Sequence, residues 1–143
     1  MSKHTQMARD LIHYHVRRAL EKEGWNIKSD PYRLSVDGVT LEIDLGAEKV
    51  VQAEKNGEKI FIEIKTFNQK SILYAFYGAF GQYICYRDGL RDSDINAPLY
   101  LAIPLSVFEK IEENLFLSQR IRQHNVKVIV VNTINETIEK WIK

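Results

Sequence analysis

The sequence has little of several features that mark particular classes of protein. Its single cysteine, Cys85, excludes an internal disulfide framework and a zinc site built from cysteines, and we expect it to be buried and inert. With 3 prolines and 7 glycines in 143 residues, it is not a collagenous or low-complexity chain. No apolar run is long enough to cross a membrane, and the N-terminus MSKHTQMARD lacks the apolar stretch of a signal peptide. We therefore expect one cytoplasmic domain over residues 1–143.

The sequence also has no excess of one charge. Lys and Arg total 20 and Asp and Glu total 19, which gives a net charge of +1. A basic field over the whole protein is absent, so any contact with phosphates must come from a local patch. There is no glycine-rich phosphate loop, which argues against a nucleotide cofactor. The candidates for a local patch, for which a solvated surface is the simpler interpretation, are Arg17, Arg18, Lys22, Lys28, Arg33, Arg87 and Arg91.

Hydrophobic periodicity predicts a mixed α/β domain. Apolar residues at helical spacing indicate helices over residues 4–23, 71–88, 106–123 and 135–142. Alternating or continuous apolar runs predict strands over residues 32–36, 41–55 with an interruption at Gly46, 60–65, 98–104 and 126–131. The resulting order, α-β-β-β-α-β-α-β-α, favours a mixed sheet with helices on both faces.

The strand over residues 60–65 carries the side chains best suited to chemistry. Its three isoleucines share one face, and Glu63 and Lys65 lie two residues apart on the other. Together with Asp44, Glu63 can hold Mg²⁺ or Mn²⁺ through oxygen ligands, to which Ile64 can add its backbone carbonyl. Lys65 can then orient a water or neutralise charge on a phosphoryl oxygen. This set suits hydrolysis of a phosphodiester, although solvated Glu-x-Lys pairs are common on strands.

The distance between the two acids depends on how the strands pair. A tight turn at Asn56-Gly57 predicts a register in which Glu48 faces Lys65. Asp44 then lies four residues further on, about 13 Å along a straight strand. A bend at Gly46 would be needed to complete the site with Asp44, and without one Glu48 is the alternative ligand.

The pattern Asp44…Glu63-Ile64-Lys65 resembles the PD-(D/E)xK nuclease superfamily, which has the restriction-endonuclease-like fold. In that superfamily the two acids bind magnesium and the lysine assists hydrolysis, so the resemblance implies these roles for Asp44, Glu63 and Lys65. The predicted order of elements over residues 4–104 also matches the αβββαβ core of the superfamily.

Two further parts of the chain are similar to elements of that superfamily. An acid on the first helix often completes such sites, which makes Asp10 the first candidate and Glu21, on the same helix face, the alternative. The stretch QYICY resembles the Q-x-x-x-Y element of RecB-type members. This resemblance implies that Gln82 and Tyr86, one helical turn apart, face the cleft together, although the tyrosine is equally well explained as a packing residue.

Nearly the whole chain resembles the XisH type of fdxN-element excision controlling factor from cyanobacteria. The segments that carry this resemblance are MARDLIHYHVRRALEKEGWNI, LEIDLGAEKVVQAEKNGEKIFIEIKTF and NAPLYLAIP. It implies a role in, or descent from, site-specific excision of a DNA element during heterocyst development. It also implies a companion protein of the XisI type.

These observations give one leading hypothesis and two alternatives. The leading one is a magnesium-dependent endonuclease that acts on DNA in site-specific rearrangement. The near-neutral charge motivates the first alternative, a non-catalytic partner of a recombinase or of the XisI-type companion. The second is a toxin-like nuclease silenced by its companion. The apolar cluster Leu115, Phe116 and Leu117 is typical of a core, and excess apolar surface there would favour a homodimer or hetero-oligomer.

Overall fold

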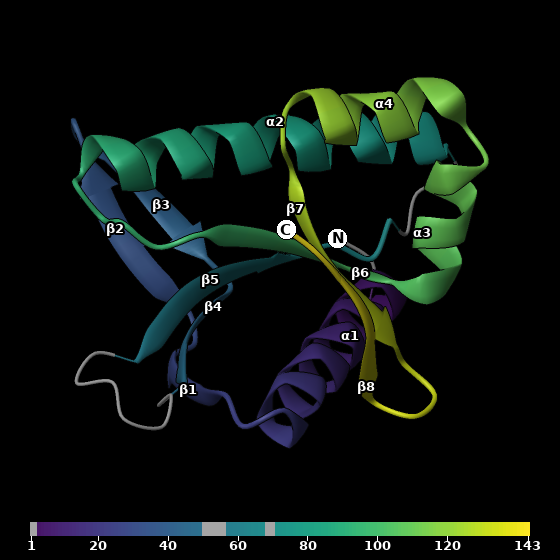
Figure 1. Cartoon of the computed structure of the whole chain (residues 1–143), viewed down its shortest axis with the longest axis horizontal. Coiled ribbons are helices and arrows are strands. Elements are labelled where there is room, and N and C mark those ends of the chain that lie inside the picture. The colour runs from purple at the N-terminus through teal and green to yellow at the C-terminus, as the bar shows by residue number, and fades with distance from the viewer. Residues whose placement is uncertain (1–2, 50–56, 68–70) are drawn as a thin grey trace.

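The computed structural model describes residues 3–49, 57–67 and 71–143. It confirms a mixed α/β architecture (Figure 1). In chain order, the elements of the described residues are α1 (Lys3–Lys22), β1 (Asn26–Ser29), β2 (Tyr32–Val36), β3 (Val39–Ile43), β4 (Leu45–Lys49), β5 (Glu58–Ile64), α2 (Ile72–Asp92), β6 (Leu99–Pro104), α3 (Leu105–Glu112), α4 (Leu115–Gln123), β7 (Lys127–Asn132) and β8 (Thr137–Ile142).

Six strands form one sheet in the order β1-β4-β5-β6-β7-β8, while β2 and β3 form a separate two-stranded ribbon. The pairs β5–β6 and β6–β7 are parallel, and the outer pairs are antiparallel. Figure 1 shows α1 on one side of the sheet and α2, α3 and α4 on the other. The predicted mixed sheet with helices on both faces is therefore confirmed.

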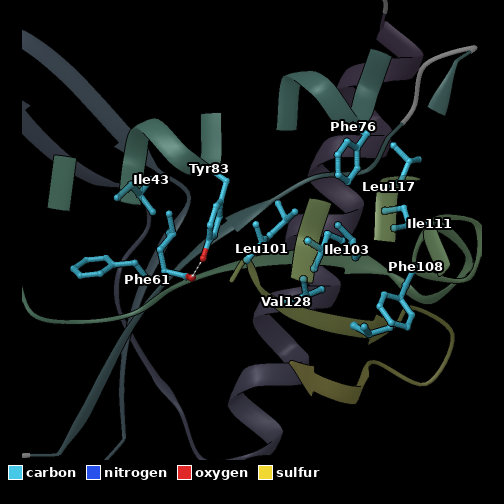
Figure 2. Packing of buried hydrophobic residues seen from close by; sticks show 14 of the residues in the cluster. Ile43, Phe61, Phe76, Tyr83, Leu101, Ile103, Phe108, Ile111, Leu117 and Val128 are labelled. Carbon is cyan, nitrogen blue, oxygen red and sulfur yellow. Dashed lines mark hydrogen bonds between the residues drawn. The ribbon is translucent and has the colours of Figure 1, made fainter. Parts of the chain in front are cut away.

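The two faces of the sheet bury separate hydrophobic cores. The isoleucines of β5 pack towards α1, as the alternation predicted, in a core that includes Val16, Leu20 and Trp25. The opposite face packs against α2, α3 and α4 through residues such as Phe61, Leu101 and Val128 (Figure 2). Side chains that alternate along β5 therefore point into different cores, and Glu63 belongs to the side of α2.

The prediction of a C-terminal helix over residues 135–142 is wrong, because this segment forms the edge strand β8. The spacing of Ile138, Trp141 and Ile142 is typical of a helix face. A register shift in the β7–β8 ladder explains it: Val131 pairs with Ile138 but Val130 pairs with Lys140, so one extra residue, Glu139, lies between them. The bulge places Ile138 and Trp141 in the same core despite their helical spacing.

Other boundaries differ from the prediction for local reasons. The single helix expected over residues 106–123 is divided, because the Asn114 side chain accepts a hydrogen bond from the Leu117 N–H at 3.2 Å and caps a second helix. The helix expected over residues 71–88 continues to Asp92. An additional short strand, β1, pairs with β4. The predicted strand over 41–55 is interrupted at Asp44, whereas Gly46 lies within β4.

Two expectations about burial are also wrong. Cys85 is exposed on α2, because the buried face of that helix is formed by other residues, including Phe76 and Tyr83. Of the apolar cluster at the start of α4, Leu117 is fully buried, but Leu115 and Phe116 are 65% and 51% exposed. Among the described residues, no helix is both long and apolar enough to span a membrane.

Candidate metal and catalytic site

The register between β4 and β5 brings the two predicted acids together. Leu45 pairs with Ile62 and Gly46 with Phe61. One further step along the same antiparallel ladder places Asp44 opposite Glu63. The predicted register, in which Glu48 faces Lys65, is therefore wrong, because Glu48 pairs with Lys59. Asn56 itself lies outside the described residues.

Asp44 and Glu63 are connected through the backbone as well. The Ile64 N–H donates a hydrogen bond to Asp44 Oδ2 at 2.8 Å, and the Asp44 N–H donates to Glu63 Oε1 at 3.2 Å. Each carboxyl group thus accepts a hydrogen bond from the other strand. This reciprocal arrangement leaves one oxygen of each group outside these backbone contacts. It was not predictable from residue types, because its donors are main-chain N–H groups.

The position of Asp44 is fixed by its two neighbours. Ile43 and Leu45 are both fully buried, but Ile43 belongs to the core under α2 and Leu45 to the core under α1. Between them the chain leaves the β2–β3 ribbon and enters the main sheet at a bend. Asp44 is therefore held where the two sheets meet, and no bend at Gly46 is required.

Glu63 is one of the few buried polar residues among those described, with 3% of its surface exposed. Burial, and after it the nearby negative charge of Asp44, raise the pKa of Glu63 from 4.5 to about 8, although the charge of Lys65 acts in the opposite direction. The side chains of Glu63 and Asp44 also hydrogen-bond to each other. At neutral pH the carboxyl group of Glu63 therefore retains its proton.

Lys65 lies on the same side as the acids and reaches towards solvent. Its Nζ is 3.4 Å from Glu63 Oε2, and its side chain is 30% exposed. Its backbone N–H donates to the Ala102 carbonyl at 3.0 Å, which fixes the end of β5 against β6. The backbone of Lys65 is therefore anchored, and its ammonium group lies next to the acids, where it can contact a ligand.

Gln82 and Tyr86 lie one helical turn apart in the middle of α2. Gln82 Nε2 donates to the Tyr86 hydroxyl at 2.9 Å. Burial raises the pKa of Tyr86, a backbone hydrogen bond from Glu42 and the Gln82 bond lower it, and the charges of Glu63 and Asp44 raise it. The charges of both acids therefore act on the Tyr86 hydroxyl, whereas the expectation that Gln82 and Tyr86 face the cleft together stays a prediction.

The structure does not place the other predicted site residues in this cluster. Asp10 and Glu21 are exposed on α1, the helix that packs on the opposite face of the sheet. Glu48 pairs with Lys59, four residues from Glu63 along β5, which removes the reason for preferring it to Asp44. No group of three His, Cys, Asp or Glu side chains suited to a metal occurs in the part of the chain that the structure describes. A supporting role for Asp10 stays a prediction.

The two acids fit a hard divalent cation. Both donors are oxygens, which Mg²⁺ and Mn²⁺ prefer, and Mg²⁺ commonly uses one or two carboxylates and keeps several waters. The pKa of Glu63 is raised by burial and by the charge of Asp44, and a bound cation would offset both effects by stabilising the charged carboxylate. Asp44 and Glu63 would hold the ion, with the Ile64 carbonyl as the further predicted ligand.

Comparison with known proteins decides the family. The family model described as XisH protein matches residues 6–139. The chain belongs to the XisH family. Two solved structures are similar to this chain over nearly their full length. An XisH family protein from Nostoc punctiforme is 36% identical, with a TM-score of 0.84, over 93% of this chain and 99% of that chain.

The second XisH relative is an fdxN element excision controlling factor protein from Anabaena variabilis. It is 37% identical, with a TM-score of 0.83, over 94% of this chain and 99% of that chain. Among curated proteins, none shows a significant match. The predicted membership of the XisH family is therefore confirmed, and at these identities the shared fold extends over the described sheet and its helices.

Proposed function

We propose that this XisH family member is a metal-dependent endonuclease-like protein that hydrolyses DNA phosphodiesters during excision of a DNA element. The observation that carries the proposal is the pairing of Asp44 with the buried Glu63, next to Lys65. The similarity to an excision controlling factor from Anabaena variabilis supports DNA as the substrate class.

Each residue of the site has a distinct task in this proposal. Asp44 and Glu63 would hold Mg²⁺ or Mn²⁺, which when bound polarises a phosphoryl oxygen and makes a water more acidic. Lys65 orients the attacking water or stabilises negative charge as it develops on the phosphoryl group. The amide of Gln82 orients the Tyr86 hydroxyl above the acids. These two residues on α2 limit the access of bulk water to the carboxyl groups.

The catalytic role of Lys65 is tested with purified protein, Mg²⁺, and supercoiled, branched and linear DNA. We expect Lys65→Ala to lower the cleavage rate at least about 100-fold, the usual cost of losing one group that stabilises transition-state charge. Lys59→Ala is the matched control, because Lys59 is an exposed lysine on the same strand, opposite Glu48. Equal activity, or equal inactivity, of wild type and Lys65→Ala on every substrate would refute the catalytic proposal.

Metal binding is tested separately by thermal unfolding in Mg²⁺ or Mn²⁺. A ligand that binds only the folded state raises its stability by RT ln(1 + [L]/Kd), so the wild-type midpoint should rise with metal concentration. Asp44→Asn and Glu63→Gln should abolish this rise, whereas Glu48→Gln should keep it. A wild-type midpoint that does not respond to either metal would contradict the assignment of the two acids as ligands.

One observation favours a second candidate function, a non-catalytic partner of a companion protein. Large apolar side chains are exposed in the first halves of α2 and α4: Tyr74 at 71%, Tyr77 at 49%, Leu115 at 65% and Phe116 at 51%. Figure 1 shows these helices on the same side of the sheet, and the Phe80 and His124 rings contact each other between them. Co-expression with the XisI-type companion tests this role: a stoichiometric complex lost in Tyr77→Ala and Phe116→Ala, together with no metal response, would favour it.

A further inference from the structure

A groove of about 530 Å³ lies beside α2 at the end opposite to its N-terminus. It is bounded by the second half of α2, the segment that follows the helix, and the first residues of β6 and β7. Three of the residues that line it are cations from two different elements, Arg87, Arg91 and Lys127, and the one lining carboxylate is Asp94. The protein as a whole is almost neutral, so this is a local concentration of positive charge.

The guanidinium of Arg87 is held in position at the groove. Arg87 Nη1 donates to the His124 carbonyl at 2.7 Å, and its guanidinium lies 5.5 Å from the centre of the Tyr83 ring. Tyr83 in turn donates to the Leu99 carbonyl at 2.7 Å, shown in Figure 2, and accepts from the Lys127 N–H at 3.1 Å. The start of β6, the start of β7 and α2 are thus joined through one fully buried phenol.

The positive charge is largely uncompensated within the groove. Among the described residues, neither Arg87 nor Lys127 has a carboxylate within ion-pair distance. Arg87 donates instead to the carbonyl groups of His124 and Asn125, which carry no charge. Arg91 is paired with Asp88 at 2.6 Å, but through one of its five N–H donors. Guanidinium and ammonium groups gathered along one groove are the usual partners of phosphate oxygens.

The rest of the lining is apolar. Leu90, Ile95 and Pro98 form part of the wall beside the Tyr83 ring. The volume is within the range of pockets for small organic ligands and exceeds what a bare inorganic anion requires. Such a combination suits a ligand with a phosphate at one end and a flat, less polar group at the other.

From these contacts we infer that the groove binds a nucleotide unit, with its phosphate on Arg87, Arg91 and Lys127 and its sugar or base against the apolar wall. The unit is either a free nucleotide or one residue of a nucleic-acid strand. The inference rests on the proposed function only because a nucleic-acid strand is the substrate that this function implies. The groove is separate from the acids, because it is lined by residues at the starts of β6 and β7, whereas Glu63 lies near the end of β5.

Binding is measured by fluorescence polarisation of a labelled single-stranded thymidine 12-mer, in EDTA so that no metal-dependent step takes part. We expect Lys127→Met and Arg91→Gln each to weaken binding about three- to tenfold. Each should also reduce the slope of log affinity against log salt by about 0.7, the value for one lost phosphate contact on a single strand. Asp94→Asn should have the opposite effect and tighten binding, which a merely structural role for this loop would not produce.

Matched controls separate the groove from the overall charge. Arg18→Gln removes a cation that forms an ion pair with Glu21 at i,i+3 on α1, just as Arg91 pairs with Asp88 on α2. Lys110→Met removes an exposed lysine on α3. Both controls should change affinity less than twofold. Equal weakening by controls and groove variants, or no binding of the 12-mer and of thymidine monophosphate, would overturn the inference.

The source of the nucleotide follows from a second titration with thymidine monophosphate. If it binds with the same dependence on Lys127 and the 12-mer binds no better, the ligand is a free nucleotide; if the 12-mer binds much better, it is a strand. Cleavage by the wild type in Mg²⁺ separates the two proposals. A wild type that binds the 12-mer through the groove but cleaves no DNA would contradict the proposed function and leave the groove inference intact. A wild type that cleaves DNA, with binding of the 12-mer unchanged in Lys127→Met and Arg91→Gln, would contradict the groove inference alone.

Discussion

At the scale of single residues, the ionised form of Glu63 destabilises the folded protein. Its folded-state pKa of about 8 exceeds its ordinary value of 4.5, mainly because it is buried. Below pH 4.5 both the folded and the unfolded states hold the proton, and between 4.5 and 8 only the folded state does. Stability is therefore lost as the pH rises through this range.

Glu63→Gln removes this titration and retains a similar shape. In the absence of metal, we expect the variant to be more stable than the wild type by about 3 kcal/mol at pH 7, since one pKa unit corresponds to about 1.4 kcal/mol. The difference should shrink towards zero at pH 4.5. Urea unfolding at several pH values measures it, and a variant less stable than wild type at pH 7 would show that Glu63 is not strained by its burial.

Residue identities could be predicted further than their geometry. The alternation along β5 was enough to place Glu63 and Lys65 opposite the isoleucines, and the spacing of Gln82 and Tyr86 was enough to pair them. The register that brings Asp44 to Glu63 was not predictable. The turn signal at Asn56-Gly57 suggested that Glu48 faces Lys65, whereas Glu48 pairs with Lys59. Register depends on the packing of both cores, which a local turn motif does not include.

At the scale of elements, α2 and β3 are in close contact at Gly89. A Cβ atom at this position would lie 2.4 Å from Leu41 Cδ1, so the leucine would have to move. Gly81 is on the same helix and has open space around it. The two glycines are therefore comparable positions on one helix, of which only Gly89 contacts the β2–β3 ribbon.

Gly81→Ala should raise the free energy of unfolding by about 0.5–1 kcal/mol, because alanine favours the helix over the unfolded chain. We expect Gly89→Ala to fall short of this gain by about 1 kcal/mol or more, because Leu41 must leave its position. Chemical denaturation of both variants gives the comparison. If the two substitutions stabilise equally, the helix and the ribbon are not in close contact at Gly89.

The strand β8 shows why hydrophobic periodicity alone did not predict the secondary structure at the C-terminus. The three-residue step from Ile138 to Trp141 has the spacing of a helix face, and only the extra residue in the β7–β8 ladder allows both to reach the same core. The buried strands β6 and β7 were predictable because continuous apolar runs of their length are typical of the centre of a parallel sheet. An edge strand carries a weaker signal, since half of it faces solvent.

At the scale of the whole molecule, β8 connects the ends of the chain. The Trp141 ring lies 5.1 Å from Tyr100 and 6.0 Å from Trp25, and its Nε1 donates to Glu23 Oε1 at 3.1 Å. His15 and Glu136 are also joined at 3.0 Å between α1 and the turn before β8. The first helix is thus held to the sheet by the last strand.

Trp141→Ala should lower the free energy of unfolding by about 2 kcal/mol or more, because it removes ring contacts with Tyr100 and Trp25 and a hydrogen bond. Trp141→Phe should lose less, since it keeps most of the ring contact. Ile134→Ala, at a position 92% exposed, is the control and should have almost no effect. Thermal unfolding compares the three variants. A Trp141→Ala midpoint equal to that of the control would disprove the role of β8 in holding α1 to the sheet.

The β4–β5 register also determines where the chain can accept insertions. Asp44 and Glu63 are aligned by a ladder that extends to Lys49 and Glu58, so the length of the segment between these two residues does not set their alignment. A few residues added between Lys49 and Glu58 should be accommodated, as long connections cost little extra entropy. One residue added between Glu58 and Glu63 would shift the ladder and turn the carboxyl group towards α1. Variation in length among related chains should therefore be concentrated in this connection and excluded from the strands beside it.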